Sequence, residues 1–136
     1  TIPLLSAAPM LGSLAIFEEA GIGAIRAKSL AMTDWLIAHI EGSGLLEPPF
    51  GYRIGTPREH ARRGGHVAVE HDDAANIAQA LRSRGIVVDF RPPDVIRIAP
   101  VALYTRYADL WHTVEALREI VETGEHQRIA ATGLVT

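Results

Sequence analysis

The stretch HVAVEHDDAANIAQALRSRGIVVDFRPPDVIRIA, residues 66–99, decides the fold. Its pattern predicts in turn a short strand, a helix, a β-branched strand, a turn and a final strand, over 67–69, 72–85, 86–88, 92–94 and 95–99. Asp72 and Asp73 favour the start of the helix because negative charge stabilises a first turn, and Gly85 ends it. This β-α-β-β order predicts the centre of an α+β domain.

Helices are predicted on both sides of this unit. Apolar residues at helical spacing, ended by Gly21 and by Gly42 with Gly44, predict two helices ahead of it. The next segment is so rich in glycine and proline that we expect a loop with one short strand near Tyr52. The predicted segments are helices over 8–20 and 22–40, the loop over 45–65, a closing helix over 104–124 and a poorly ordered polar tail over 125–136. The predicted domain therefore covers 1–124.

The composition limits the classes of function. With 136 residues, 48% of them hydrophobic, the chain can form one core and has little room for a second domain. It has no cysteine, which excludes a disulfide framework, a thiolate zinc site and a cysteine nucleophile. Its 13 basic residues are outnumbered by 16 acidic ones, which argues against a nucleic-acid partner. We see no signal peptide and no apolar run of bilayer length, and so we expect a cytoplasmic protein without a membrane partner.

Arg97 is the residue that the pattern singles out. Strand alternation places Arg97 on one face with Val95 and Ala99, and Ile96 and Ile98 on the other face. A guanidinium between two apolar side chains, in a sheet that helices should cover, needs an anion. That anion can be the carboxylate of a ligand, held bidentately, or the carboxylate of a neighbouring Asp or Glu. The sequence leaves both a ligand site and an internal ion pair at a sheet edge open.

Other polar residues are weaker candidates. Three histidines cluster in the sequence without the i, i+4 helical spacing of metal ligands, and so we expect no metal site at His60, His66 and His71. The strongest basic patch predicts a solvated loop or an anion contact at Arg58, Arg62 and Arg63. Lys28, the only lysine, lies in mid-helix where solvated helix faces place lysines, and we do not expect it to be catalytic.

Four segments together resemble the C-terminal part of the kynureninase family. They are TIPLLS (1–6), EEAGIGAIRAKSLAMTDWLI (18–37), TPREHARRGGHVAV (56–69) and ALRSRGIVVDFRPPDVIRIAPVALYTRYADLWHTVEALREI (80–120), in the family's order. The similarity covers about 1–121, and its most specific parts are RGGHVAV and the run 84–104. The resemblance implies the small C-terminal domain of a fold-type I enzyme that depends on pyridoxal 5′-phosphate (PLP). It also implies a cytoplasmic homodimer of the kynurenine pathway, in tryptophan catabolism and NAD biosynthesis, that hydrolyses L-kynurenine to anthranilate and L-alanine.

The resemblance also implies roles for two residues. The family's arginine in the motif RxAP binds the substrate α-carboxylate, and it falls on Arg97 in RIAP. A Thr or Asn near the cofactor phosphate falls on Thr1, whose hydroxyl can donate to a phosphate oxygen. The family's proline after this position is replaced by Ile2, although Pro3 is retained.

The family's other PLP-binding residues have no counterpart in this sequence. They are the lysine of the internal aldimine, the aspartate facing the pyridine nitrogen, the aromatic residue stacked on the ring, and a tyrosine and a tryptophan near the phosphate. All lie upstream in the family. The resemblance therefore implies the C-terminal piece of a larger enzyme, separated from its N-terminal large domain. It implies PLP in the full-length enzyme, no PLP bound covalently to this piece, and no turnover by this piece alone.

Two alternatives stay open at this stage. One is the small domain of another type I enzyme, desulfurase-like or aminotransferase-like, which also offers a carboxylate-binding arginine. The other is a self-sufficient ligand-binding or regulatory module with no exposed apolar surface. The larger-enzyme hypothesis predicts instead that the first two helices leave apolar patches open, because they would pack against the missing domain.

Overall fold

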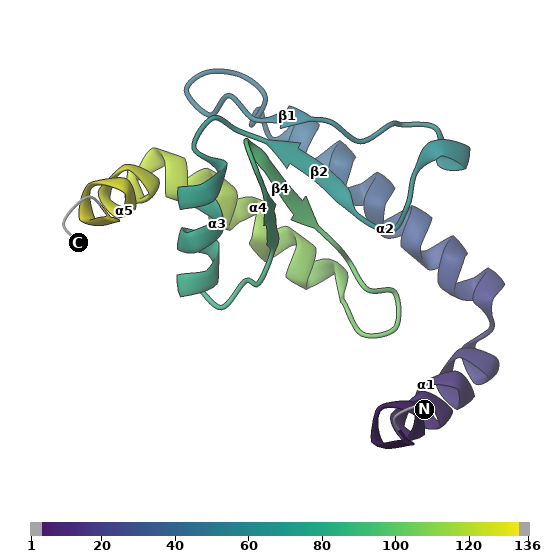
Figure 1. The fold of residues 1–136 in the computed structure, drawn as a ribbon. Helices are drawn as coiled ribbons and strands as arrows, with labels where there is room; N and C mark the ends of the chain where they lie inside the picture. Colours follow the sequence, from purple (N-terminus) through teal and green to yellow (C-terminus); the bar gives the residue numbers. More distant parts are fainter. Residues whose placement is uncertain (1–3, 134–136) are drawn as a thin grey trace.

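Five α-helices, one 3-10 helix and a four-stranded sheet make up residues 4–133, the part of the chain that this computed structural model describes (Figure 1). In chain order they are α1 (Leu4–Ala20), α2 (Ile22–Gly42), β1 (Arg53–Ile54), η1 (His60–Arg62), β2 (Val67–Glu70), α3 (Ala74–Ser83), β3 (Asp89–Arg91), β4 (Val95–Ile98), α4 (Tyr107–Glu122) and α5 (Glu125–Gly133). The predicted α+β class and its β-α-β-β centre are confirmed.

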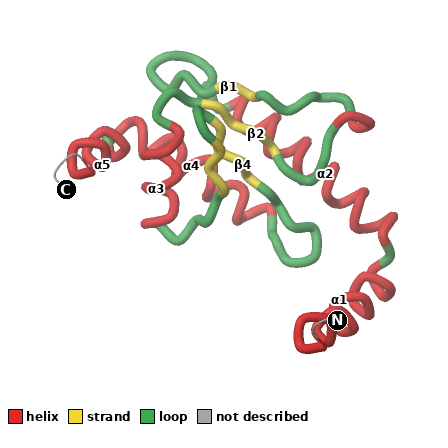
Figure 2. Tube along the Cα trace, in the orientation of Figure 1, coloured by secondary structure: helices red, strands yellow, loops and turns green. Residues whose placement is uncertain are grey.

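The sheet is antiparallel throughout, in the order β1-β2-β4-β3. Figure 2 shows its short strands gathered between the helices. The strand predicted at 86–88 lies instead at 89–91, as β3. The tight turn at 92–94 brings the residues just before it into register with β4, so that Asp89 lies opposite Arg97. The turn therefore decided the position of this strand, against the β-branched residues before it.

One face of the sheet forms the core with α2, α3 and α4. Cross-strand partners such as Val69 and Ile96 lie on this face and are fully buried. The helices contribute residues of their apolar stripes, among them Leu36, Ile77 and Leu117. Figure 1 shows α2 and α4 running behind the sheet. Since the helices cover this face, the charged side chains of the sheet are left on the other.

Helix α1 projects from the rest of the structure (Figure 1). Gly21, at a φ of 76°, separates it from α2, and the two helices are bent by 80°. Its apolar side chains are exposed at Met10, Leu11, Leu14, Ile16 and Phe17, with Leu11 at 74%. Within residues 4–133 no single helix is long and apolar enough to span a membrane. The pair 8–20 and 22–42 meets the length and composition criteria only when its two bent helices are taken together.

The C-terminal segment differs from the sequence prediction. We predicted a poorly ordered polar tail over 125–136, whereas the structure has helix α5 up to Gly133. His126 is only 3% exposed, and its Nδ1 lies 3.1 Å from the carbonyl oxygen of Ile120. Arg84, before β3, also forms an ion pair with Glu125. The ion pair with Arg84 and the packing of Ile129 against the core therefore hold this helix. The division of the chain at 124 stays a prediction.

Candidate functional site

Alternation along β4 separates the apolar face of the sheet from a charged one. Ile96 and Ile98 are buried in the core, while the side chain of Arg97 points the other way and is 35% exposed. We expected helices to cover the sheet around Arg97, but they pack on the isoleucine face only. The register places seven residues together on what we call the open face: Arg53, Ala68, Glu70, Asp89, Arg91, Val95 and Arg97.

Arg97 forms an ion pair with Asp89, its partner on the edge strand β3. Nε of Arg97 donates a hydrogen bond of 2.6 Å to Oδ2 of Asp89, and Nη2 donates to the same oxygen. Nε of Arg91 also donates to that oxygen, at 2.9 Å. The hydrogen bond from Arg97, opposed in part by desolvation and supported by Arg91, holds the pKa of Asp89 below its usual value. The ion-pair alternative that the sequence left open for Arg97 is thus present in the structure.

Asp89 is the part of this site that the sequence analysis missed. A signal for it was present. Since 92–94 form the turn, Arg91 faces Val95, and counting back along both strands brings Asp89 opposite Arg97. The turn is where the sequence predicts it, but β3 begins three residues after the start of the predicted strand, and the predicted strand does not contain Asp89.

A second charged cluster lies on the open face around Arg53 in β1. Its guanidinium is 3.2 Å from Asp72 and 3.3 Å from Asp94, and its Nε is 3.6 Å from Glu70. These groups are partly exposed, so each ion pair contributes little to stability. The three carboxylates carry more negative charge than the single guanidinium neutralises. The open face therefore carries net negative charge around β1 and net positive charge around Arg97 and Arg91 on β4 and β3.

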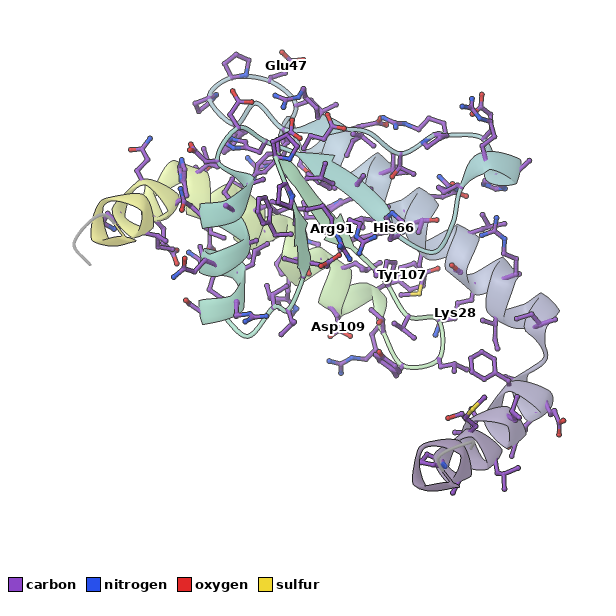
Figure 3. All side chains as sticks on the ribbon, in the orientation of Figure 1. Lys28, Glu47, His66, Arg91, Tyr107 and Asp109 are labelled. Atoms are coloured by element: carbon purple, nitrogen blue, oxygen red, sulfur yellow. The ribbon has the colours of Figure 1, made fainter. Side chains whose placement is uncertain are left out.

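Lys28 fastens the segment that follows β4. Its Nζ donates a hydrogen bond of 2.6 Å to the carbonyl oxygen of Ala102, and Figure 3 shows the side chain reaching from α2 to this loop. The only lysine of the sequence thus forms a hydrogen bond that joins α2 to this loop. Thr1, predicted to lie near the cofactor phosphate, falls outside the residues that the structure describes.

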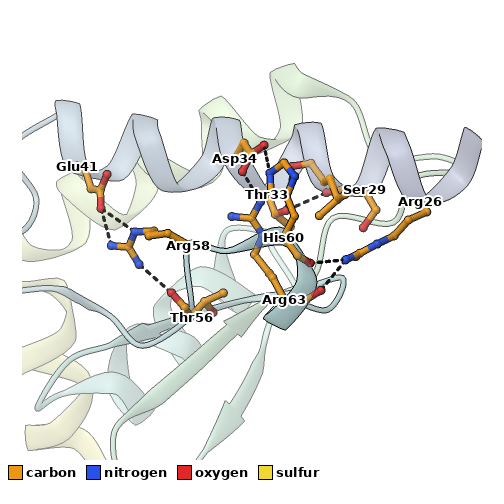
Figure 4. A network of polar contacts seen from close by, with 10 residues as sticks. Arg26, Ser29, Thr33, Asp34, Glu41, Thr56, Arg58, His60 and Arg63 are labelled. Atoms are coloured by element: carbon orange, nitrogen blue, oxygen red, sulfur yellow. Dashed lines mark hydrogen bonds and ion pairs between the residues drawn. The ribbon is translucent and has the colours of Figure 1, made fainter.

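A network of polar contacts joins α2 to the loop before β2 (Figure 4). Asp34 on α2 accepts hydrogen bonds from Arg63 and from Nε2 of His60, the latter at 2.8 Å. Although desolvation raises the pKa of Asp34, these two hydrogen bonds outweigh it and lower the pKa below its usual value. Arg26 donates to the backbone carbonyls of His60 and Arg63, each at 2.8 Å. The network holds the loop before β2 against α2.

The three arginines of the predicted basic patch all have acidic partners. Arg58 pairs with Glu41, at 2.5 Å, and Arg62 with Glu59, at 3.4 Å. Arg63 pairs with Asp34 and its side chain is only 1% exposed, so that the anion contact, one of the two predicted alternatives, is buried here. Protein carboxylates thus neutralise the patch, and it offers no excess positive charge to an anion.

The three histidines of the loop region lie in different surroundings. His60 contacts Asp34, and His66 is exposed. His71 lies with its Nε2 2.9 Å from the carbonyl of Phe50, and its Nδ1 accepts a hydrogen bond of 2.9 Å from the backbone N–H of Asp73. Burial lowers the pKa of His71. In the described part of the chain, no three His, Asp or Glu side chains are grouped so that they could hold a metal ion.

Comparison with known proteins gives consistent matches. The sequence profile of the kynureninase C-terminal domain family matches residues 25–117. The kynureninase of Geobacillus thermodenitrificans is 43% identical over 127 residues, which are 93% of this chain and 29% of that protein. The kynureninase of Bacillus anthracis is 44% identical over 128 residues, and that of Shouchella clausii 42% over 125, each covering 92% of this chain and 28% of the relative. The chain therefore spans less than a third of the length of these relatives.

Proposed function

Because the chain belongs to the family of kynureninase C-terminal domains, we propose that it is the small domain of a PLP-dependent hydrolase that converts L-kynurenine and water to anthranilate and L-alanine. In this proposal the chain's own contribution is to bind and orient the substrate. The lysine and the other groups that hold PLP would come from the large domain, since in the family they lie upstream of the part that this chain covers. PLP would supply the electron sink for the reaction.

Arg97 carries the proposal. It is the arginine of the RIAP motif, and its guanidinium lies on the open face, where a ligand can reach it. A planar guanidinium suits the α-carboxylate of an amino acid, which it binds through parallel hydrogen bonds. Fixing the carboxylate fixes the orientation of the rest of the substrate, and this lowers the entropic cost of reaching the reactive geometry.

The exposed apolar surface of α1 supports a larger enzyme over a self-sufficient module. A module that functions alone should cover its apolar side chains, whereas Leu11 is 74% and Met10 59% exposed on α1. We propose that the large domain, in a cytoplasmic homodimer, covers this helix. The 136-residue chain alone should then show no turnover of kynurenine.

The first test is the intact mass of the protein expressed from its native gene. We expect a mass far above the 14.7 kDa of this chain, together with the yellow absorbance of PLP. A native mass of 14.7 kDa without a chromophore would instead favour the binding module.

The second test uses this longer protein with the substitution Arg97→Lys. We expect KM for kynurenine to rise about tenfold or more, because a single ammonium cannot reproduce the two parallel hydrogen bonds of the guanidinium. An unchanged KM would contradict the role of Arg97. Assays with cysteine and with other amino acids as substrates would separate a kynureninase from a desulfurase or an aminotransferase.

A further inference from the structure

The ion pair between Arg97 and Asp89 uses only one edge of the guanidinium. A guanidinium has two edges that can each bind a carboxylate, one formed by Nε and Nη2 and the other by Nη1 and Nη2. Asp89 occupies the first edge, with Oδ2 accepting from both Nε and Nη2. Nη1 donates to no protein group in the described chain. The second edge is thus available while the first is held.

The charge around Asp89 favours a second anion on Arg97. Arg91 donates to the same Oδ2 of Asp89 at 2.9 Å, so that two guanidinium groups share one carboxylate. The three side chains together carry one net positive charge. A carboxylate that approaches Arg97 is therefore attracted, although Asp89 is already bound. Without Arg91 the pair would be neutral and would attract an anion less.

The neighbour of Arg97 on its other side leaves space on the open face. Ala68 of β2 lies opposite Arg97, with only a methyl group on that face. Asp89 lies opposite Arg97 on the edge side. Arg97 thus stands between a carboxylate that anchors it and a small residue that does not obstruct it.

We propose that Asp89 is a positioning residue, which holds Arg97 by its Nε–Nη2 edge so that the Nη1–Nη2 edge receives the substrate carboxylate, while Arg91 balances the charge of Asp89. The proposal rests on the proposed function, in which Arg97 binds that carboxylate. It adds that the orientation of Arg97 is set before the substrate arrives, so that less side-chain entropy is lost on binding.

The test is a double-mutant cycle in the longer PLP-containing protein, with L-kynurenine as the substrate. Asp89→Asn keeps the shape of the side chain and removes its charge. We expect it to raise KM by up to about fivefold with kcat changed by less than about twofold, because substrate binding depends on a guanidinium that a partly exposed ion pair orients. In the Arg97→Lys background the same substitution should have no further effect on KM, since lysine has no Nε–Nη2 edge to hold.

Asp94→Asn is the matched control. It removes one carboxylate from the turn between β3 and β4, but that carboxylate pairs with Arg53 and does not contact Arg97. We expect KM to stay within about twofold of the unsubstituted protein, as for substitutions without a shared partner. An equal rise of KM in both variants would show a general effect of surface charge and would overturn the role of Asp89.

The outcomes separate the two proposals. If Arg97→Lys leaves KM unchanged, the proposed role of Arg97 fails. If Arg97→Lys raises KM but Asp89→Asn leaves it unchanged or lowers it, Arg97 binds the carboxylate and the positioning role of Asp89 is wrong. A lowered KM would identify Asp89 as a competitor of the substrate.

A measurement on the 136-residue chain tests the anchoring without any turnover. Titration of the Asp89 carboxyl by NMR should give a pKa below its usual value, and Arg97→Gln should move that pKa back toward it. An Asp89 that titrates at its usual value in the unsubstituted chain would show that the ion pair is not held in solution, and would overturn the inference.

Discussion

The two faces of the sheet differ in what they contribute to the protein. On the helix-covered face, Val67, Val69 and Ile96 are fully buried, and their apolar area stabilises the fold. On the open face, Arg97 and Asp89 are partly exposed and their ion pair adds little to stability. Both sets of side chains come from the same short strands, in alternation. Substitutions one residue apart should therefore separate stability from substrate binding.

The largest effect should follow a substitution on the helix-covered face. Ile96→Ala removes a fully buried side chain, and we expect the free energy of unfolding to fall by about 3 kcal/mol through lost burial and the cavity left behind. Urea denaturation of the 136-residue chain measures this. Ile96→Val, with a loss of about 1 kcal/mol, gives a graded value if the alanine variant does not fold.

The adjacent position provides the contrast to Ile96. Arg97→Gln should change the free energy of unfolding by less than about 1 kcal/mol, because the side chain and its partner are partly exposed. Equal losses at positions 96 and 97 would contradict the separation of the two faces.

A smaller effect is expected where a hydrogen bond crosses the core. The hydroxyl of Tyr52 donates to the carbonyl oxygen of Leu117 at 2.9 Å, and Tyr52 is 1% exposed. Tyr52→Phe keeps the ring and should cost about 1 kcal/mol, again measured by urea denaturation. No loss would mean that the hydrogen bond adds nothing beyond the packing of the ring.

His71 should make the stability of the folded chain depend on pH. Burial lowers its pKa in the folded chain, against hydrogen bonding to Phe50 and the charges of Asp72 and Asp73, while the neighbouring His126 lowers it further. The unfolded chain therefore binds more protons as the pH falls below about 6.5, the usual pKa of histidine. Stability due to neutral His71 is complete above that pH and is lost as the pH falls toward the folded pKa.

Thermal unfolding at a series of pH values tests this prediction. His71→Gln should flatten the dependence between about pH 6.5 and pH 5, a range above the usual pKa values of Asp and Glu. The carboxylates with lowered pKa, Asp34, Asp89 and Asp109, should contribute a separate loss at more acidic pH. An unchanged slope in the variant would show that another group titrates in this range.

The smallest effect is expected in the second charged cluster of the open face. Arg53 contacts three carboxylates but is 48% exposed. Arg53→Gln should change the free energy of unfolding by about 0.5 kcal/mol or less, and the change should shrink further at high salt. Denaturation at two salt concentrations measures it, and a loss comparable to that of Tyr52→Phe would contradict the ranking.

How far the sequence predicted the structure depends on how local the signals were. Alternation and turn residues predicted β2, β4 and the face of Arg97 correctly, because they act over a few residues. The position of β3 was wrong because pairing with β4 decided it. The burial of Arg63 and the presence of helix α5 were missed because each depends on residues far away in the sequence, such as Asp34 for Arg63. Long-range pairing of charged groups leaves no periodic pattern in a single sequence.

The contact between Lys28 and Ala102 can be followed by chemical labelling of the lysine side chain. Because the sequence holds one lysine, acylation of side-chain amines can modify only this position. Its ammonium donates to the carbonyl of Ala102, so the reagent must compete with that hydrogen bond. The rate of acylation, followed by mass spectrometry, thus reports how firmly the segment after β4 is seated on α2. The 136-residue chain therefore contains a probe of the segment that follows RIAP without any engineered residue.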